Sequence, residues 1–440
     1  MVLNKLKLIN KFIKERQDVD VKYDYINKID GYIINKKNDE IEELIIPEIY
    51  NNGYDGEKSV KMIAKDGFRN CLKITNIIIP DTIIGIGSYA FADCKNLYSI
   101  HLSSKLSEIS ECTFYECSNL SKIDIPNIIK SIGIFAFYKC INLTSINLPD
   151  TIESIGCRAF GNCSQLTQIN IPVKITFIDE FLCEKCSNLQ TVSMSDNVSV
   201  IGPVAFRSCS SLQNINFSKN LIEIREEAFA HCTQLKTVIL PDCLKFIRSG
   251  AFKKCSFEII ELPKNLESIG ECCFEGCDKL KSIEIPDKIT TLSKDMFCGC
   301  DQLEKAIIPK SITSIGEGVF AFCEKLTSLD IPQIVTEIGV DAFRCCKSLT
   351  KIDIPYGITT INTRTFAGCG NLTKVDIPSS VTEIGEDAFK GCKSLKDFTI
   401  PDSVLKIDKT AFDGCSKEVQ AVYNEWKKNE VMRNFCMKEF

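Results

Sequence analysis

Cysteine is the residue whose abundance in this chain first suggests chemistry. The 440 residues include 25 cysteines but only 2 histidines, His101 and His231, and neither histidine stands in a recognisable motif. Thiolates can bind zinc, form disulfides or act as nucleophiles, and each use needs a partner group at short range. Because histidine usually supplies the general base and many of the metal ligands, this composition argues against an enzyme.

Close cysteine pairs are where a metal or redox site would be sought. Four such pairs occur: Cys183–Cys186, Cys298–Cys300, Cys272–Cys273 and Cys345–Cys346. A structural zinc ion needs four ligands, and a nucleophilic cysteine needs a neighbouring base, which neither histidine provides. Cys183 stands where the equivalent segments carry Phe, so a core substitution is the simpler interpretation and metal or redox use is the alternative. We expect no catalytic, cofactor-binding or metal-binding residue.

The composition also limits the location of the chain and the class of its partners. Hydrophobic residues make up 44% and charged residues 25% of the sequence, and the formal net charge is -5, which gives no support to nucleic-acid binding. Lys5, Lys7 and Lys11 interrupt the apolar residues of the start, and no run reaches the roughly 18 apolar residues of a membrane span. We therefore expect reduced thiols, no membrane span and a cytoplasmic location, with the cell surface as the alternative.

Sixteen cysteines recur at a nearly constant interval, and we refer to them as the repeat cysteines. Fourteen of the fifteen intervals are 23 residues long, and the interval from Cys255 to Cys277 is 22. The repeat cysteines are Cys71, Cys94, Cys117, Cys140, Cys163, Cys186, Cys209, Cys232, Cys255, Cys277, Cys300, Cys323, Cys346, Cys369, Cys392 and Cys415. A fixed period of this length is the signature of a repeat architecture.

One unit of the repeat, residues 372–392, shows what each segment is expected to form. Val375 and Ile377 alternate with Asp376, which predicts a short half-buried strand that ends at Pro378. A second extended piece stops at Gly385, in a slot whose residues suit a tight or left-handed backbone, although Arg225 and Arg248 in the same slot show that not every repeat requires a positive φ. The spacing of Ala388, Phe389 and Cys392 then predicts one helical turn with an apolar inner side.

Such a unit makes one coil that cannot bury its own apolar side chains, so successive coils must stack with their strands in parallel. The pattern Leu-x-x-Ile-x-Ile-Pro-x-x-Ile-x-x-Ile-Gly-x-x-Ala-Phe-x-x-Cys-x-x, as in Leu326 to Ser348, resembles the repeat of the BspA-like leucine-rich repeat family. The resemblance covers residues 72–415. It implies a right-handed solenoid of leucine-rich repeat type, with parallel strands and a short helical or 3-10 turn per repeat, that serves protein binding, including surface adhesins and antigens.

Both ends depart from the repeat and are expected to cap the solenoid. We predict an N-terminal helix over residues 1–17 within a capping segment 1–40, then a solenoid over 41–415, then a capping helix over 416–440. From Pro47 to Cys71 the chain is about ten residues longer than a normal unit, which predicts an inserted surface loop near 48–66 that includes Tyr54. The N-terminal helix could instead anchor at a membrane surface.

Function is expected on the outward-facing residues of the first strand, which vary between repeats while the inward residues do not. Three aspartates, Asp330, Asp353 and Asp376, share one row, and Lys351 and Lys374 stand two positions before the last two aspartates. These five residues are the candidate partner-binding site. We expect a non-enzymatic scaffold that presents this surface to protein partners, and a surface adhesin or antigen is the alternative. A face that is merely solvated is the simpler interpretation of the row.

Overall fold

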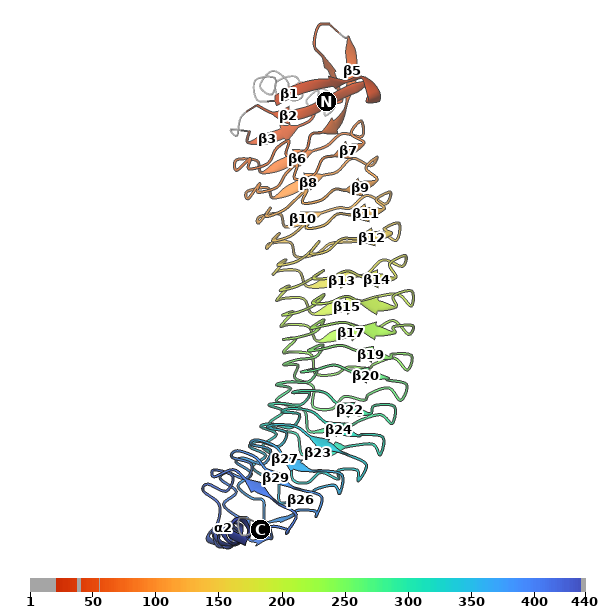
Figure 1. Cartoon of the computed structure of the whole chain (residues 1–440). Coiled ribbons are helices and arrows are strands. Elements are labelled where there is room, and N and C mark those ends of the chain that lie inside the picture. The colour runs from red at the N-terminus through yellow and green to blue at the C-terminus, as the bar shows by residue number, and fades with distance from the viewer. Residues whose placement is uncertain (1–20, 38–40, 55, 437–440) are drawn as a thin grey trace. The chain divides into compact units, whose positions relative to one another are not determined.

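The computed structural model describes residues 21–37, 41–54 and 56–436, with side chains up to residue 429. The chain divides into two compact units, Met1–Asn220 and Leu221–Phe440. Within each unit, coils of one kind are stacked (Figure 1). Most coils contribute two short parallel strands, as the period predicts.

The strands of the first unit form two ladders. Ladder A collects the first strand of each coil and ladder B the second. Ladder A comprises β3 (Glu43–Ile45), β6 (Asn76–Ile78), β8 (Ser99–His101), β10 (Lys122–Ile123), β13 (Gln168–Asn170), β15 (Thr191–Ser193) and β17 (Asn214–Asn216). Ladder B comprises β5 (Glu57–Ile63), β7 (Gly85–Ile86), β9 (Glu108–Ile109), β11 (Ser131–Ile132), β12 (Ser154–Ile155), β14 (Phe177–Ile178) and β16 (Val200–Ile201).

The second unit repeats this arrangement. Its ladder A comprises β21 (Ser282–Glu284), β23 (Lys305–Ile307), β26 (Lys351–Asp353), β28 (Lys374–Asp376) and β30 (Asp397–Phe398). Its ladder B comprises β18 (Glu223–Ile224), β19 (Phe246–Ile247), β20 (Ser268–Ile269), β22 (Thr291–Leu292), β24 (Ser314–Ile315), β25 (Glu337–Ile338), β27 (Thr360–Ile361), β29 (Glu383–Ile384) and β31 (Lys406–Ile407). Paired residues are one repeat apart, as in Ile352 with Val375.

Stacked phenylalanines fill the centre of each unit. In the second unit, neighbouring rings such as Phe320 and Phe343 lie with their centroids 5.6 Å apart and nearly parallel. The thiols of most repeat cysteines pack behind this column and donate a hydrogen bond to a carbonyl of the preceding coil, as Cys346 Sγ does to Phe320 O at 3.1 Å. The repeat cysteines are thus small apolar core residues that also satisfy a buried carbonyl.

The glycine slot after each ladder B strand is explained by close contact between coils, not by a left-handed backbone. A Cβ atom added to Gly133 would lie 2.5 Å from Glu111 N, and one added to Gly339 would lie 2.5 Å from Glu317 N. Neither glycine has a positive φ. Our expectation of a left-handed backbone at this slot is therefore wrong, because what glycine provides there is room for the backbone of the neighbouring coil.

Left-handed residues occur elsewhere, at two places in the turn that closes each coil. Cys112 and Glu116 show the pattern, with φ of 53° and 56°. Between them the N–H groups bond to carbonyls three residues earlier, as in a 3-10 turn, or to the next coil, as Phe114 N does to Ala136 O at 2.8 Å. The left-handed residues stop these turns from continuing as a helix. The N–H groups of the turn bond alternately within the turn and to the next coil, so both kinds of N–H group have an acceptor.

Replacing Lys254 with glycine is expected to stabilise the protein by about 0.5–1 kcal/mol, because a side chain at positive φ is strained and glycine is not. Lys254 has a φ of 56°, and the equivalent residues in the next two coils, Gly276 and Gly299, are glycines. Urea denaturation of the full chain measures the change. A loss of stability would contradict the expected strain.

The N-terminal end is built from strands. Residues 21–36 form an antiparallel hairpin of β1 (Val21–Ile26) and β2 (Gly31–Lys36), with a 3-10 turn, η1 (Asn27–Ile29), between them. Strand β2 pairs with β5, and β5 pairs with β7, so the hairpin covers the first edge of ladder B. The helix expected over residues 1–17 lies outside the described residues.

The insertion near residues 48–66 is not the loop that we expected. Strand β4 (Ile49–Asn51) pairs antiparallel with β5, so the extra residues extend one coil into a second hairpin. Tyr54 lies at its tip and is 94% exposed. The apolar residues Val60, Met62 and Ile63 are the signal that could have predicted β5.

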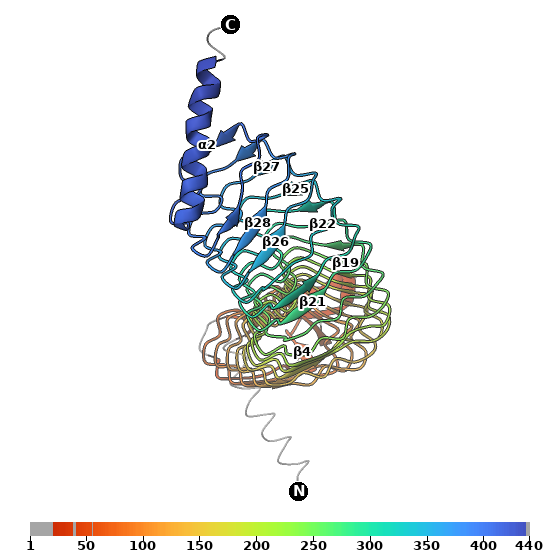
Figure 2. The same cartoon turned by 90° about the horizontal axis from the view of Figure 1, so that it is seen from below.

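Helix α2 (Lys417–Cys436) packs beside the last coils of the second unit (Figure 2). Its own residues Val419, Tyr423 and Trp426 are buried on the side that faces these coils. The Trp426 indole N–H donates to Val404 O at 3.2 Å, and the Tyr423 ring lies 5.3 Å from that of Phe412. Ser416 caps the first turn by accepting a hydrogen bond from Val419 N. The helix covers apolar side chains that the final coil would otherwise expose.

Candidate functional site

The five residues of the predicted partner-binding site lie on the outward side of ladder A in the second unit. Strands β26 and β28 pair in register, which places Lys351 beside Lys374 and Asp353 beside Asp376. The intervening Ile352 and Val375 point inward and are 1% exposed. The structure therefore arranges the four side chains as two neighbouring pairs on one exposed face.

The lysines compensate the aspartates beside them. Lys351 Nζ lies 3.0 Å from Asp353 Oδ2, and Lys374 Nζ lies 3.3 Å from Asp376 Oδ1 and 3.4 Å from Asp397 Oδ2. Hydrogen bonds to these two carboxylates raise the pKa of Lys374. Because all of these groups are exposed, the pairs contribute little to stability, and they leave the aspartates able to exchange partners.

Asp330 differs from the other two aspartates. It is exposed, it lies in a segment without a regular strand, and within the described chain it forms no ion pair. Its carboxylate is thus the member of the row that is free for a partner.

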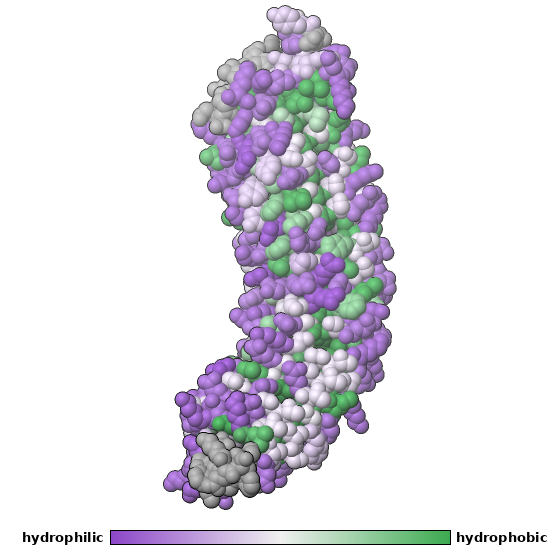
Figure 3. Space-filling model, in the orientation of Figure 1, coloured by the Kyte–Doolittle hydropathy of each residue, from purple (hydrophilic) through white to green (hydrophobic). Residues whose placement is uncertain are grey.

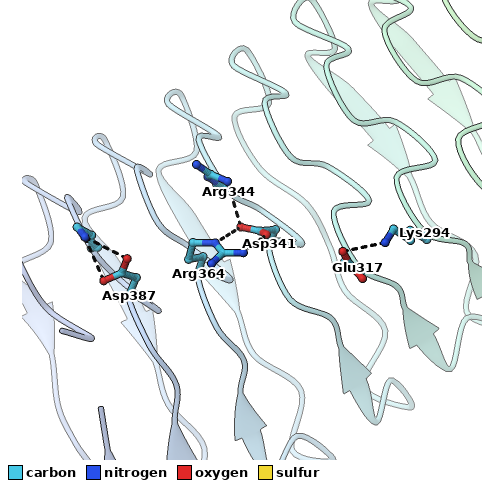
Figure 4. A network of polar contacts seen from close by, with 7 residues as sticks. Lys294, Glu317, Asp341, Arg344, Arg364 and Asp387 are labelled. Atoms are coloured by element: carbon cyan, nitrogen blue, oxygen red, sulfur yellow. Dashed lines mark hydrogen bonds and ion pairs between the residues drawn. The ribbon is translucent and has the colours of Figure 1, made fainter. Parts of the chain in front are cut away.

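A second group of charges links neighbouring coils along their closing turns (Figure 4). Arg364 donates to both carboxylate oxygens of Asp341, at 2.9 and 2.7 Å, and Arg344 lies 3.7 Å from the same carboxylate. Lys294 pairs with Glu317 at 2.9 Å. Asp341 and Arg364 are 23 positions apart, so the period itself could have revealed this contact. The bidentate pair is half-buried and supports the stacking of the coils.

The fold places the first of the close cysteine pairs in the core. Cys183 and Cys186 are both fully buried in the core, and burial raises the pKa of Cys183 well above its usual value. Across residues 21–429, apart from the gaps, no group of three or more His, Cys, Asp or Glu side chains is placed to hold a metal ion. The 24 cysteines of this part are all free thiols. His101 is exposed on β8, and His231 lies at a left-handed position of a turn.

A group of hollows surrounds the short repeat that follows Cys255, a feature that the residue pattern did not predict. Three hollows of about 420, 490 and 570 Å³ adjoin it, each lined by residues of 256–265 and of neighbouring coils. Exposed apolar side chains stand nearby, among them Ile239 and Ile259. On the face that Figure 3 displays, hydrophobic residues form patches between hydrophilic ones. Patches of this kind are usual places for contact with other molecules.

Comparison with known proteins identifies the repeat. The family model of the BspA type leucine rich repeat region matches residues 61–150, 130–257, 245–370 and 359–429. A leucine-rich repeat protein from Bacteroides ovatus is 29% identical over 87% of this chain and 94% of that chain, with a TM-score of 0.71.

Two further solved structures are similar to lesser degrees, and no curated protein matches the chain. A leucine-rich repeat protein from T. pallidum is 27% identical over 44% of this chain and 88% of its own, with a TM-score of 0.40. The pneumococcal vaccine antigen PcpA is 16% identical over 92% of this chain and 94% of its own, with a TM-score of 0.42. No helix in the described part of the chain is both long and apolar enough to cross a membrane.

Proposed function

Because the chain belongs to the BspA type leucine rich repeat family, we propose that it is a non-enzymatic scaffold that binds protein partners through the outward face of ladder A in its second unit. The observation that carries the proposal is the separation of the two sides of each strand. Inward residues such as Ile352 are buried and apolar in every coil, whereas the outward rows are exposed and change in character along the unit.

The charges on this face favour binding of a partner protein with a basic surface. Asp330 has no ion pair within the described chain. The lysines that pair with Asp353 and Asp376 have long, exposed side chains. A partner that brings its own Lys or Arg side chains can take the place of Lys351 and Lys374 at little cost. Such a contact steers association over a distance and weakens as salt is added.

Reversing the charge of Asp330, Asp353 and Asp376 to Lys is expected to reduce partner capture about tenfold or more and to remove its salt dependence. The melting temperature should change little, because the three carboxylates are exposed. The measurement is capture from a cell lysate by the full chain, quantified by mass spectrometry at low and high salt.

A matched control reverses three acidic residues on or beside ladder B of the same unit: Glu267, Glu337 and Glu383. It changes the net charge equally but leaves the proposed face intact. If both triple variants capture the same proteins as the unmodified chain at low salt, the aspartate row is only a solvated face.

We also propose that the protein works in a reducing compartment, which favours the cytoplasmic scaffold over the surface adhesin. Supporting this, thiols such as Cys157, Cys272 and Cys298 are only partly buried and are free. In an oxidising environment such thiols would be open to oxidation. The thiol state of the protein as it is isolated from cells tests this location.

A further inference from the structure

The repeat that begins at Cys255 is one residue shorter than its neighbours, and the core compensates for the loss. Phe257 takes the place that Leu has in the neighbouring repeats, and it is fully buried. Its ring lies edge-on to those of Phe252 and Phe274, with centroids 6.1 and 6.2 Å away. The larger side chain fills the interior, but nothing replaces the missing residue at the surface.

The surface of ladder A is interrupted at this repeat. Its ladder A segments, residues 237–239 and 259–261, form no regular strand and pair through isolated bridges, Ile239 with Glu261 and Ile259 with Ser282. A hollow of about 420 Å³ opens beside these bridges, and we call it the short-repeat hollow. It is lined by residues 259–264, 282–286 and 305–307 of three successive coils.

Three isoleucines are exposed in and beside the short-repeat hollow. Ile239 is 87% exposed, Ile259 59% and Ile307 42%. Each occupies an outward position of ladder A, where other coils carry polar residues such as Ser328 or Asp353. Exposed aliphatic side chains grouped around a hollow gain free energy when another apolar surface covers them.

Two glutamates give the hollow its electrostatic character. The bridge between Ile259 and Ser282 sets Glu261 beside Glu284, about 5 Å away along the ladder. Neither carboxylate forms an ion pair within the described chain, although Lys264 and Lys305 also line the hollow. Glu258 is different, because it pairs with Lys281 at 2.6 Å. Two adjacent carboxylates that form no ion pair favour a cation between them.

We propose that the short-repeat hollow receives an extended segment of a partner protein in which aliphatic residues stand two positions before and two positions after a Lys or Arg. The cation lies between Glu261 and Glu284, and the aliphatic side chains cover the three isoleucines. This proposal rests on the protein-binding function proposed above and adds the chemistry of the partner. Every second side chain of an extended segment points to the same side, so this spacing lets the cation and the aliphatic residues face the hollow together.

A defined peptide tests the proposal with the full chain. The probe is a fluorescein-labelled nonapeptide with Leu-Ser-Lys-Ser-Leu at the centre of a Gly/Ser frame, compared with matched Leu-Ser-Glu-Ser-Leu and Ser-Ser-Lys-Ser-Ser peptides by fluorescence anisotropy. The peptide that carries both Leu and Lys is expected to bind about tenfold more tightly than either comparison peptide. Equal binding of all three peptides would overturn the proposal.

Substitutions at the hollow locate the binding. Combining Glu261→Lys with Glu284→Lys should abolish the preference for Lys over Glu, and Ile259→Ser should abolish the preference for Leu over Ser. Glu337→Lys on ladder B is the control and should leave both preferences unchanged. All four positions are exposed, so circular dichroism should show unchanged folding. If both preferences persist in the hollow variants, the peptide binds elsewhere and the assignment is wrong.

The outcome is separable from that of the scaffold function. If the chain binds all three peptides equally while reversal of the aspartate row still abolishes partner capture, the scaffold function is supported and the hollow is not its binding site. If the unmodified chain captures no partner but binds the peptide that carries both Leu and Lys at the hollow, the hollow is a binding site and the proposed function of the face of β26 and β28 is wrong. Concentration-dependent dimerisation that Ile259→Ser removes would show that a second copy fills the hollow, and would overturn the proposal.

Discussion

Replacing Phe343 with alanine is expected to lower the free energy of unfolding by about 3–5 kcal/mol. The ring is fully buried and stacked between Phe320 and Phe366, with centroids 5.6 and 5.5 Å away. Because the strands on both sides fix the spacing between coils, the neighbouring rings cannot close the cavity. Urea denaturation followed by circular dichroism measures the loss.

Phe322→Ala is the matched control. This ring is 39% exposed, and it lies under the Arg344 guanidinium instead of within the column of stacked rings. The substitution should cost about 1 kcal/mol or less. Equal losses from the two substitutions would mean that the stacked rings do not hold the coils together.

The thiols are expected to fall into two reactivity classes that differ by orders of magnitude. When cells are lysed in alkylating agent and denaturant, all 25 cysteines should be found reduced, because every described cysteine is free. In the folded protein, the half-buried thiols should react first: Cys157, Cys243, Cys272, Cys298, Cys345 and Cys415. The other repeat cysteines should react only on unfolding, since burial raises the pKa of residues such as Cys346 well above the usual value.

Adjacent Cys345 and Cys346 provide the internal control, because only Cys346 is fully buried. The reaction also depends on pH. Burial raises the pKa of Cys272 and Cys298 to about 11, so their alkylation rates should rise about tenfold per pH unit between pH 7 and 10 as the thiolate fraction grows. Equal labelling of Cys345 and Cys346, or a disulfide or zinc ion found in the isolated protein, would contradict this assignment.

The repeat, its two ladders and its core could be predicted from sequence because the same residue type must fill the same place in each coil. The period that placed Phe343 also placed its neighbours. The reason for the glycine slot could not be found in this way. It depends on how closely two backbones approach, and other coils solve the same contact differently: Ser110 and Asn362 occupy the slot and donate side-chain hydrogen bonds to the preceding coil.

The candidate site was only partly predictable. The period sets the register, so the neighbouring positions of Asp353 and Asp376 followed from their numbers. Asp353 and Asp376 form ion pairs with lysines, whereas Asp330 forms none within the described chain. This difference depends on side-chain conformation, which the period does not determine. The short-repeat hollow could not be predicted for another reason. The missing residue is visible in the sequence, but the sequence does not show where its absence leaves a space. Phe257 fills that space in the core, so the hollow forms only at the surface.

The constant offset between paired residues also bears on how such a chain can change length in evolution. Ring stacks, thiol hydrogen bonds and ion pairs such as that of Asp341 with Arg364 all join residues one coil apart. Duplication or loss of one whole coil therefore gives every remaining residue an equivalent neighbour, whereas a smaller change must be repaired locally. The coil that contains Phe257 is consistent with such a local change: the larger side chain fills the core, and the surface of the shortened coil carries the hollow.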